Sequence, residues 1–118
     1  MPDRRPPLED FLPLRPVEFD ILLALGDGER HGYAIMQEAH RRSEGALPLE
    51  PGTLYRALRR MREAGLVTET TGRGQDGGDE RRRYYRLTAL GRRVAAAEAQ
   101  RMAGLVIAAR ARGLLRKA

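Results

Sequence analysis

The hydrophobic positions in the first half of the chain recur at helical spacing. The stretch RPVEFDILLALGDG, residues 15–28, predicts a short helix that is buried on two sides and ends at its two glycines. One apolar flank consists of Val17, Ile21, Leu22 and Leu25, and the other of Phe19 and Leu23. The stretch RHGYAIMQEAHRRSEG, residues 30–45, predicts a second helix with Gly45 as its C-cap. The inner face of this second helix consists of Ile35, Met36 and Ala39.

A third helix is predicted to begin at Pro51, because proline is favoured in the first turn of a helix. A rotation of about 100° per residue places an apolar stripe on its inner face, made of Leu54, Ala57, Leu58, Met61 and Gly65. The opposite face carries Gly52, Arg56, Arg59 and Glu63. The two flanks are Tyr55 with Arg62, and Thr53 with Arg60. The exposed side of this helix is therefore rich in hydroxyl and guanidinium groups.

After the third helix the pattern changes from helical to alternating. LVTETT (66–71) and RYYRLT (83–88) predict two strands of a hairpin, joined by a glycine-rich loop at 72–82. The side chains of the second strand alternate between two faces, Tyr85 with Leu87 and Tyr84 with Arg86. Thr88 is the predicted N-cap of a last helix of about 28 residues, which would be on the order of 40 Å long.

Three helices, a hairpin and a long helix, in that order, predict a winged helix-turn-helix. This is a mainly α (α+β) fold with a two-stranded β-wing. Residues 14–88 are the predicted winged-helix domain, and residues 89–118 are a predicted C-terminal dimerisation helix. Residues 1–13 contain four of the seven prolines and predict a loosely ordered arm.

The last helix has an apolar path that continues beyond what a small domain core requires. The path consists of Leu90, Val94, Met102, Leu105, Val106 and Ala109. A protruding helix with such a path is typical of an interface between chains, so we predict a homodimer. The alternative is that this helix folds back onto the first helix of its own chain.

The charge is distributed unevenly along these 118 residues, which are enough for one domain. Residues 1–50 contain 6 Arg and 10 acidic residues, whereas residues 51–118 contain 16 Arg or Lys and 6 acidic residues. This segregation favours a polyanionic partner, although an arginine-rich genome would also raise the basic count. The sequence has no cysteine, which excludes disulfides and zinc–thiolate sites. No signal-peptide core or membrane-length apolar run is visible, so we expect a cytoplasmic protein with no membrane partner.

The exposed side of the third helix suits double-stranded DNA. Gly52 has no side chain to hold a phosphate away from the free amides of the first turn. Thr53 and Tyr55 can donate hydrogen bonds to phosphate oxygens. Three guanidiniums behind them can address phosphates or guanine edges, namely those of Arg56, Arg59 and Arg60. The alternative is a solvated face, for which Glu63 offers Arg59 an i, i+4 partner.

The wing is predicted to contact the DNA backbone through arginines on or beside the hairpin loop. The residues chosen for this role are Arg73, Arg81 and Arg82. Three acidic residues, Asp76, Asp79 and Glu80, lie in the same loop and weaken the case for its tip.

Three motifs in this order resemble one known family. They are ILLALGDGERHGYAIMQEA (21–39), PGTLYRALRRMREAGLV (51–67) and RRRYYRLTALGRR (81–93). The chain is similar, from about residue 17 to 93, to the PadR family of bacterial transcription regulators. The resemblance implies a winged helix-turn-helix whose C-terminal helix mediates homodimerisation, usually in a repressor.

The resemblance also implies roles for individual residues. Those implied to approach the DNA backbone are Tyr33, Tyr55, Gly52 and Thr53, and those implied to anchor the wing are Tyr84 and Tyr85. The chain departs from the family at Glu50, where members often have a small polar residue before the Pro-Gly pair. The tail is also short, with one long helix as in the smaller members.

Catalysis and cofactor binding have little support. Ser43 is the only serine, Asn and Cys are absent, and His31 and His40 are nine residues apart. No nucleophile–base pair and no metal-ligand spacing is therefore visible, and no cofactor is expected. We interpret His31 as a helix-start residue and His40 as a surface position.

The sequence thus predicts a dimeric DNA-binding regulator, with two recognition helices meeting a pseudo-palindromic operator whose half-sites are ~34 Å apart. One alternative is an effector-sensing regulator with an apolar small-molecule site at the dimer interface. No aromatic residue follows Tyr85, so the long helix cannot stack a planar ligand. The other alternative is a winged-helix protein-interaction module, which would have no need of an exposed Gly-Thr pair with three guanidiniums behind it.

Overall fold

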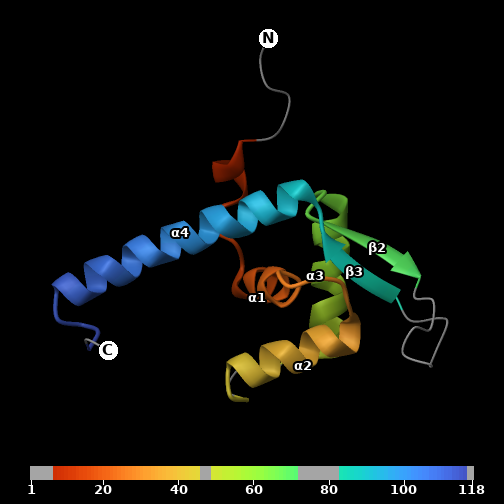
Figure 1. Cartoon of the computed structure of the whole chain (residues 1–118), viewed down its shortest axis with the longest axis horizontal. Helices are drawn as coiled ribbons and strands as arrows, with labels where there is room; N and C mark the ends of the chain where they lie inside the picture. Colours follow the sequence, from red (N-terminus) through yellow and green to blue (C-terminus); the bar gives the residue numbers. More distant parts are fainter. Residues whose placement is uncertain (1–6, 46–48, 72–82, 117–118) are drawn as a thin grey trace, which may run out of the picture.

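The computed structural model of the chain describes residues 7–45, 49–71 and 83–116. These residues form a 3₁₀ turn, four α-helices and a three-stranded antiparallel sheet. In chain order the elements are η1 (Leu8–Phe11), α1 (Pro16–Ala24), β1 (Arg30–His31), α2 (Gly32–Arg42), α3 (Pro51–Glu63), β2 (Val67–Thr71), β3 (Arg83–Leu87) and α4 (Ala89–Ala111). Helix α1 lies at the centre and contacts α2, α3 and α4 (Figure 1). The winged-helix fold predicted from the sequence is confirmed.

The core is built where α1 meets the other three helices and the base of the hairpin. Its largest fully buried apolar side chains are Ile21, Leu22, Leu25, Ile35, Leu54, Leu58, Met61, Val67 and Val94. The second apolar flank predicted for α1 is only partly present. Phe19 packs against the core, but Leu23 is 42% exposed, so α1 is not buried on both sides.

Helices α2 and α3 end in the same hydrogen-bonded turn, with different residues at its left-handed position. After α3, Gly65 has φ +83°, and the Leu66 amide donates to the Met61 carbonyl at 2.9 Å. Gly65 therefore ends α3 and is not part of its packing stripe, contrary to prediction. After α2 the residue at the position of Gly65 is Glu44, with φ 55°, and the predicted C-cap Gly45 follows one position later, also left-handed with φ 81°.

The sheet has one strand more than the sequence predicted. Its order is β1-β3-β2, and β1 consists of only Arg30 and His31, opposite Tyr85 and Tyr84. A two-residue strand shows no alternation of its own and forms only because β3 presents a free edge. In β3, Tyr85 is buried and Arg86 is exposed, which confirms the predicted alternation.

The start of α4 lies directly against the turn that follows α3. The Thr88 hydroxyl accepts a hydrogen bond from the Gly91 amide at 2.9 Å, as predicted for an N-cap, and lies 2.6 Å from the Gly65 carbonyl, to which it donates. A Cβ atom on Gly91 would lie 2.0 Å from the Leu66 carbonyl oxygen, so only glycine permits this approach. The helix has 23 residues and ends at Ala111, earlier than predicted.

The N-terminal segment is attached to α4 by one buried carboxylate. Glu98 is 0% exposed, and its Oε2 accepts a hydrogen bond from the Leu14 amide at 2.9 Å. The Arg101 Nε lies 2.5 Å from Glu98 Oε1. Arg101, together with the Leu14 amide, lowers the pKa of Glu98 against the effect of burial. Because Leu8 and Phe11 also pack on the core, the ordered body includes part of the predicted arm.

Within the described part of the chain, none of the helices has the length and apolarity needed to cross a membrane.

Candidate nucleic-acid interface

Helix α3 presents its two faces as the helical pattern predicted. Leu54, Ala57, Leu58 and Met61 are buried. Gly52, Arg56 and Arg59 are exposed on the opposite side, and 47% of Tyr55 is exposed. Thr53 and Arg60, on one flank, are half-buried. The candidate DNA-binding residues of this helix therefore share one accessible surface.

The first turn of α3 is open to an anion. Glu50 occupies the N-cap position, but its side chain makes no capping hydrogen bond. The amides of the first turn are consequently free of a side-chain partner at the positive end of the helix dipole. A Cβ atom on Gly52 would lie 3.2 Å from Arg56 Nη1, so the glycine also makes room for this guanidinium over the first turn.

Carboxylates divide the arginines of α3 into two classes. Arg60 Nε lies 3.4 Å from Glu18 Oε2 on α1, and Arg62 Nη1 lies 2.5 Å from Glu69 Oε2 on β2. Within the described residues, by contrast, no hydrogen bond or ion pair engages the guanidiniums of Arg56 and Arg59. Arg56 and Arg59 are therefore the arginines of this helix that can bind a partner without giving up an internal contact.

A groove of about 410 Å³ separates α3 from the hairpin. Its polar lining consists of Tyr55, Arg56, Arg59, Arg62, Glu69, Arg83 and Tyr85. The Tyr85 hydroxyl donates to Glu69 Oε1 at 3.0 Å. Burial and this hydrogen bond raise the pKa of Tyr85 to about 12, so the phenol remains a donor at neutral pH. The groove is basic overall, with one carboxylate in its lining.

The start of α2 lies beside α3 and brings further aromatic residues to this side. The His31 Nδ1 accepts a hydrogen bond from the Ala34 amide at 3.2 Å, which confirms His31 as a helix-start residue. Its ring meets that of Tyr84 edge-on, with centroids 5.5 Å apart. A Cβ atom on Gly32 would lie 2.3 Å from the Tyr55 hydroxyl oxygen, so the Tyr55 ring covers this glycine. Tyr33 is 59% exposed.

The residues that form this arrangement match one known protein family. The PadR-like transcriptional regulator family matches residues 21–97, which include the end of α1, the helices α2 and α3, the hairpin strands and the first turns of α4. The chain belongs to this family. An uncharacterized protein of Lysinibacillus sphaericus is 33% identical over 72 residues, which are 61% of this chain and 64% of that protein. The chain thus spans somewhat less than two thirds of that relative.

Solved structures of transcription regulators share the fold. A PadR family transcription regulator from Clostridium difficile has a TM-score of 0.68 and 27% identity, covering 80% of this chain and 94% of that one. A transcriptional regulator from Clostridium thermocellum has a TM-score of 0.63 and 27% identity, covering 77% and 85%. Bacillus subtilis PadR, solved in complex with operator DNA, has a TM-score of 0.61 and 23% identity, covering 70% and 46%, and shows the fold alone.

The wing of this PadR-family chain is only partly described. Arg73, Arg81 and Arg82, the predicted backbone contacts, lie outside the described residues. Their neighbour Arg83 is described: its side chain is 66% exposed, and its Nη1 lies 3.4 Å from Glu69 Oε1. Sequence reasoning missed Glu69, because its position opposite Tyr85 depends on the pairing register of the two strands.

The predicted dimer-interface residues divide between the two halves of α4. Val94 is 0% exposed, so it belongs to the interior of its own chain and not to an interface, contrary to prediction. Leu90 is half-buried against the core, and its contact with a second chain stays a prediction. Leu105 and Val106 are 58% and 38% exposed, Met102 and Ala109 are half-buried, and Ile107, which was not predicted, is 66% exposed.

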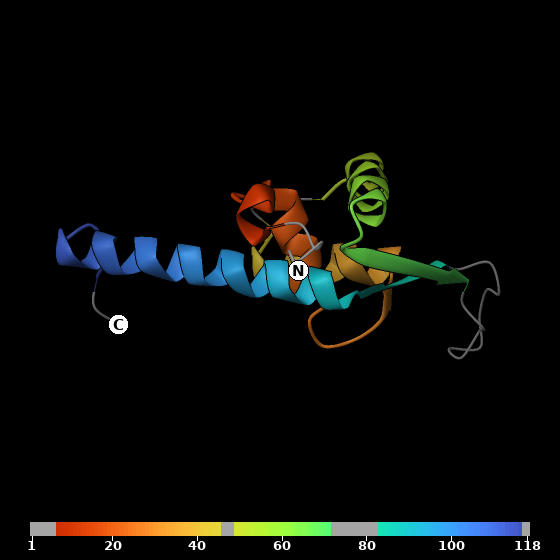
Figure 2. The same ribbon diagram turned by 90° about the horizontal axis from the view of Figure 1, so that it is seen from above.

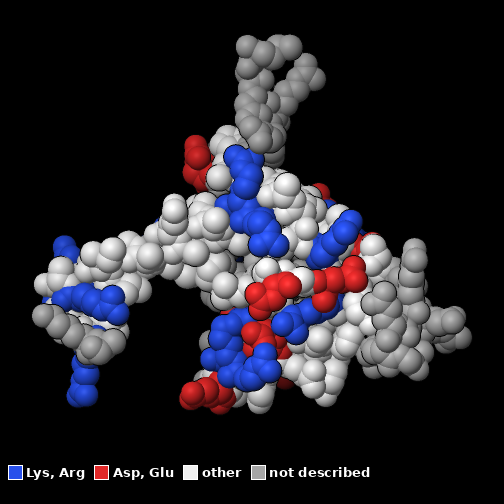
Figure 3. Space-filling view, viewed as in Figure 1, with Lys and Arg blue, Asp and Glu red and all other residues white. Residues whose placement is uncertain are grey.

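The distal half of α4 stands clear of the rest of the molecule. It extends away from the other helices in two perpendicular views (Figures 1 and 2). On the face shown in Figure 3 this projection is uncharged over most of its length, and basic side chains gather at its end. Over the helical body, acidic and basic side chains are interspersed. The exposed apolar residues Leu105, Val106 and Ile107 therefore form a surface on the distal half of α4 that no other described element covers.

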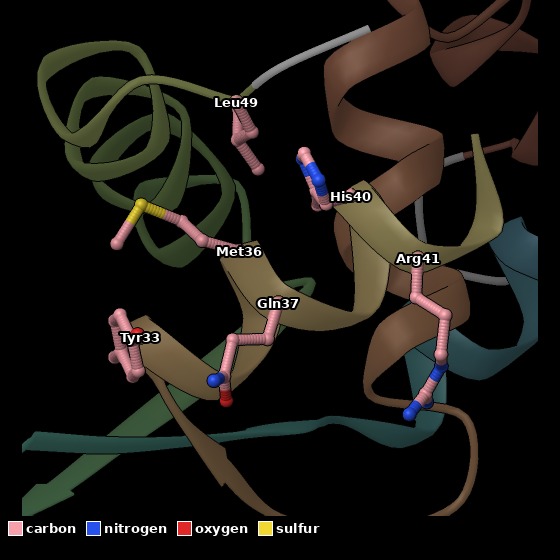
Figure 4. Close-up of a pocket in the computed structure, with 6 residues that line it drawn as sticks. All are labelled: Tyr33, Met36, Gln37, His40, Arg41 and Leu49. Carbon is pink, nitrogen blue, oxygen red and sulfur yellow. The ribbon is translucent and has the colours of Figure 1, made fainter. Parts of the chain in front are cut away.

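A second hollow of about 620 Å³ lies on α2, beside the start of α3. Figure 4 shows its lining, which consists of Tyr33, Met36, Gln37, His40, Arg41 and Leu49. It is separate from the projecting half of α4, where the effector-sensing alternative places an apolar ligand. Within the described residues, no cluster of three or more His, Asp or Glu that could hold a metal ion is present.

Proposed function

We propose that this PadR-family chain is a sequence-specific DNA-binding repressor that binds a pseudo-palindromic operator as a homodimer. The proposal rests on Arg56 and Arg59, on the exposed side of α3. Their guanidiniums make no hydrogen bond or ion pair within the described residues. In a helix-turn-helix the second helix of the pair enters the major groove, where arginine binds the O6 and N7 atoms of guanine.

The first turn of α3 supplies phosphate contacts in this proposal. Its uncapped amides and the hydroxyls of Thr53 and Tyr55 are accessible from the same side as the two arginines, and Tyr33 adds a hydroxyl from α2. These contacts orient α3, and Arg56 and Arg59 then discriminate between bases. Arg73, Arg81 and Arg82 remain predicted backbone contacts of the wing.

Fluorescence-anisotropy titration tests the base contacts. A duplex from the promoter just upstream of the protein's own gene is compared with a scrambled duplex, from low to physiological salt. The native protein is expected to prefer the promoter by ~10³ or more. Arg56→Ala and Arg59→Ala should each reduce that preference by roughly 10-fold to 100-fold, the effect of losing about 1–3 kcal/mol of base discrimination.

Arg93→Ala is the matched control for these variants, because Arg93 is an exposed arginine in the first turns of α4, outside the groove. It should leave the preference unchanged. Promoter preference that survives in both α3 variants would exclude α3 from base recognition. Transcription in vitro from the same promoter should fall as the protein is added, as expected of a repressor.

The homodimer is supported by the exposed apolar end of α4. Leu105 and Val106 are exposed there in a regular helix, and no other element of the described residues covers them. Leu105→Glu in the full chain should shift sedimentation from dimer to monomer and abolish tight operator binding. Ala111→Glu is the control, because Ala111 lies on the opposite side of the helix from the predicted interface. If the Leu105→Glu protein still sediments as a dimer, the interface does not lie on the distal half of α4.

A further inference from the structure

Glu69 is the carboxylate in the lining of the groove between α3 and the hairpin, among the guanidiniums of Arg56, Arg59, Arg62 and Arg83. Its side chain is 20% exposed. Three donors from two elements converge on it. Arg62 Nη1 of α3 lies 2.5 Å from Oε2, while Arg83 Nη1 and the Tyr85 hydroxyl of β3 lie 3.4 and 3.0 Å from Oε1.

We propose that Glu69 is a positioning residue of the DNA interface that withholds Arg62 and Arg83 from DNA phosphates. The inference rests on the proposed function. It adds that the groove arginines have two roles, since Arg62 and Arg83 are held by Glu69 while Arg56 and Arg59 contact DNA. With two of the four guanidiniums held by Glu69, attraction to any duplex is reduced. Binding then depends more strongly on Arg56 and Arg59, which address the base edges.

The pairing register explains why one carboxylate holds both arginines. Glu69 stands directly opposite Tyr85 in the β2–β3 ladder, so both side chains leave the same face of the hairpin. Arg83 lies two residues before Tyr85 in β3 and points to that face as well. The same face meets α3, because Val67 and Tyr85 are buried on it. Glu69 therefore joins α3, β2 and β3 through side-chain contacts.

The exposure of the partners argues that these contacts serve binding rather than folding. The side chains of Arg62 and Arg83 are 42% and 66% exposed, and exposed ion pairs contribute little to stability. Both guanidiniums nevertheless lie in the groove, where a phosphate could replace the carboxylate. Affinity for nonspecific duplex depends on how many phosphates are neutralised, so removing Glu69 should release arginines for that purpose.

Glu69→Gln provides the test, because the amide keeps the shape and an acceptor oxygen for Tyr85 but lacks the charge. Its binding to the promoter duplex and to the scrambled duplex is measured by anisotropy at several salt concentrations. The log–log salt slope on the scrambled duplex should become steeper by ~0.9 for each arginine released, up to ~1.8. The promoter preference should fall at least ~3-fold, because new phosphate contacts favour every duplex alike.

Glu29→Gln is the matched control. Glu29 is an exposed acid that accepts a hydrogen bond from Thr70 outside the groove, and its loss changes the net charge equally. It should leave both slope and preference as in the native protein. A Glu69→Gln protein with the native slope and preference would overturn the inference, and so would an equal response of the two variants.

Arg62→Gln supplies a second test, and its measurement in the native background does not depend on the folding of Glu69→Gln. In the native background it should leave the salt slope unchanged, because Arg62 is held by Glu69. In the Glu69→Gln background it should lower the slope by ~0.9. A loss of ~0.9 from Arg62→Gln alone would mean that Arg62 already binds phosphate, and the inference would be wrong.

The two proposals fail in different ways. If the native protein binds promoter and scrambled duplexes equally, the proposed function fails and this inference fails with it. If the native protein prefers the promoter but Glu69→Gln behaves like it, only the inference about Glu69 fails.

Discussion

Replacing one glycine in α4 tests the closest approach between elements of the fold. In Gly91→Ala, the new Cβ would lie 2.0 Å from the Leu66 carbonyl oxygen and 2.9 Å from the Leu66 carbonyl carbon. Both are backbone atoms, so no side-chain rotation relieves the clash. The first turn of α4 has to move by about 1 Å, which weakens the hydrogen bonds of Thr88 to the Gly65 and Leu66 carbonyls.

The expected loss of stability is about 2 kcal/mol. Overpacking against backbone costs roughly 1–3 kcal/mol, and a weakened hydrogen bond adds about 1 kcal/mol. The better helix propensity of alanine returns about 1 kcal/mol. With an m-value of about 2 kcal/mol/M, the urea midpoint should fall by about 1 M without a change in slope. Circular dichroism at one fixed protein concentration measures it, because association shifts apparent stability.

Gly104→Ala is the control within the same helix. Apart from the neighbouring residues and backbone of its own helix, no heavy atom of the described chain lies within 4 Å of a Cβ at position 104, which faces away from the predicted interface. This variant should gain about 0.5–1 kcal/mol from the alanine alone. If Gly91→Ala raises the urea midpoint as Gly104→Ala does, the contact between α4 and the Leu66 carbonyl is absent from the folded protein.

Three further substitutions have defined outcomes. Glu44→Gly should raise the free energy of unfolding by about 0.5–1 kcal/mol, and the urea midpoint with it, because φ 55° strains a residue with a Cβ; an unchanged midpoint would argue against this turn. Arg101 lowers the pKa of Glu98, so its ionised form stabilises the fold above the unfolded pKa, and this stability is lost as pH falls through the folded pKa. The midpoint difference between native protein and Glu98→Gln should therefore be large at pH 7 and shrink as pH falls below the unfolded pKa of about 4.3 towards the lower folded pKa, and a pH-independent difference would contradict it. Gly32→Ala should displace the Tyr55 ring and weaken operator binding by about 5-fold in anisotropy, with little effect on the urea midpoint; equal binding would separate Tyr55 from the DNA contact.

The helices were predictable because each carries its own periodic signal. The α3 stripe from Leu54 to Met61 and the Thr88 cap need only local rules, and the structure has them where the pattern placed them. Strand β1 has no such signal, since its two residues become a strand only when the edge of β3 is available. Leu23 shows a related limit, because hydrophobicity cannot say which side of a central helix remains uncovered.

The sequence predicted which residue types form the candidate site, but not which of its arginines have internal partners. Sequence position placed Arg56, Arg59 and Arg60 together on one side of α3. Only the folded chain shows that Arg60 is close to Glu18 on α1, while Arg56 and Arg59 have no internal partner among the described residues. The sequence also could not show that Val94 is buried in its own chain while Leu105 is exposed. Both continue one apolar path, and only tertiary packing determines how much of α4 the other helices cover.

The junction at Thr88 makes α4 a lever. The Thr88 hydroxyl bonds to the Gly65 and Leu66 carbonyls after α3 and to the Gly91 amide at the start of α4, so α3 moves with the base of the long helix. Twenty-three helical residues span about 35 Å. In a dimer joined through the far ends, a change of about 10° in the crossing angle of the two α4 helices would change the separation of the two α3 helices by roughly 6 Å, nearly two base-pair steps along DNA. The stiffness of α4 would then determine which spacings of operator half-sites such a dimer accepts.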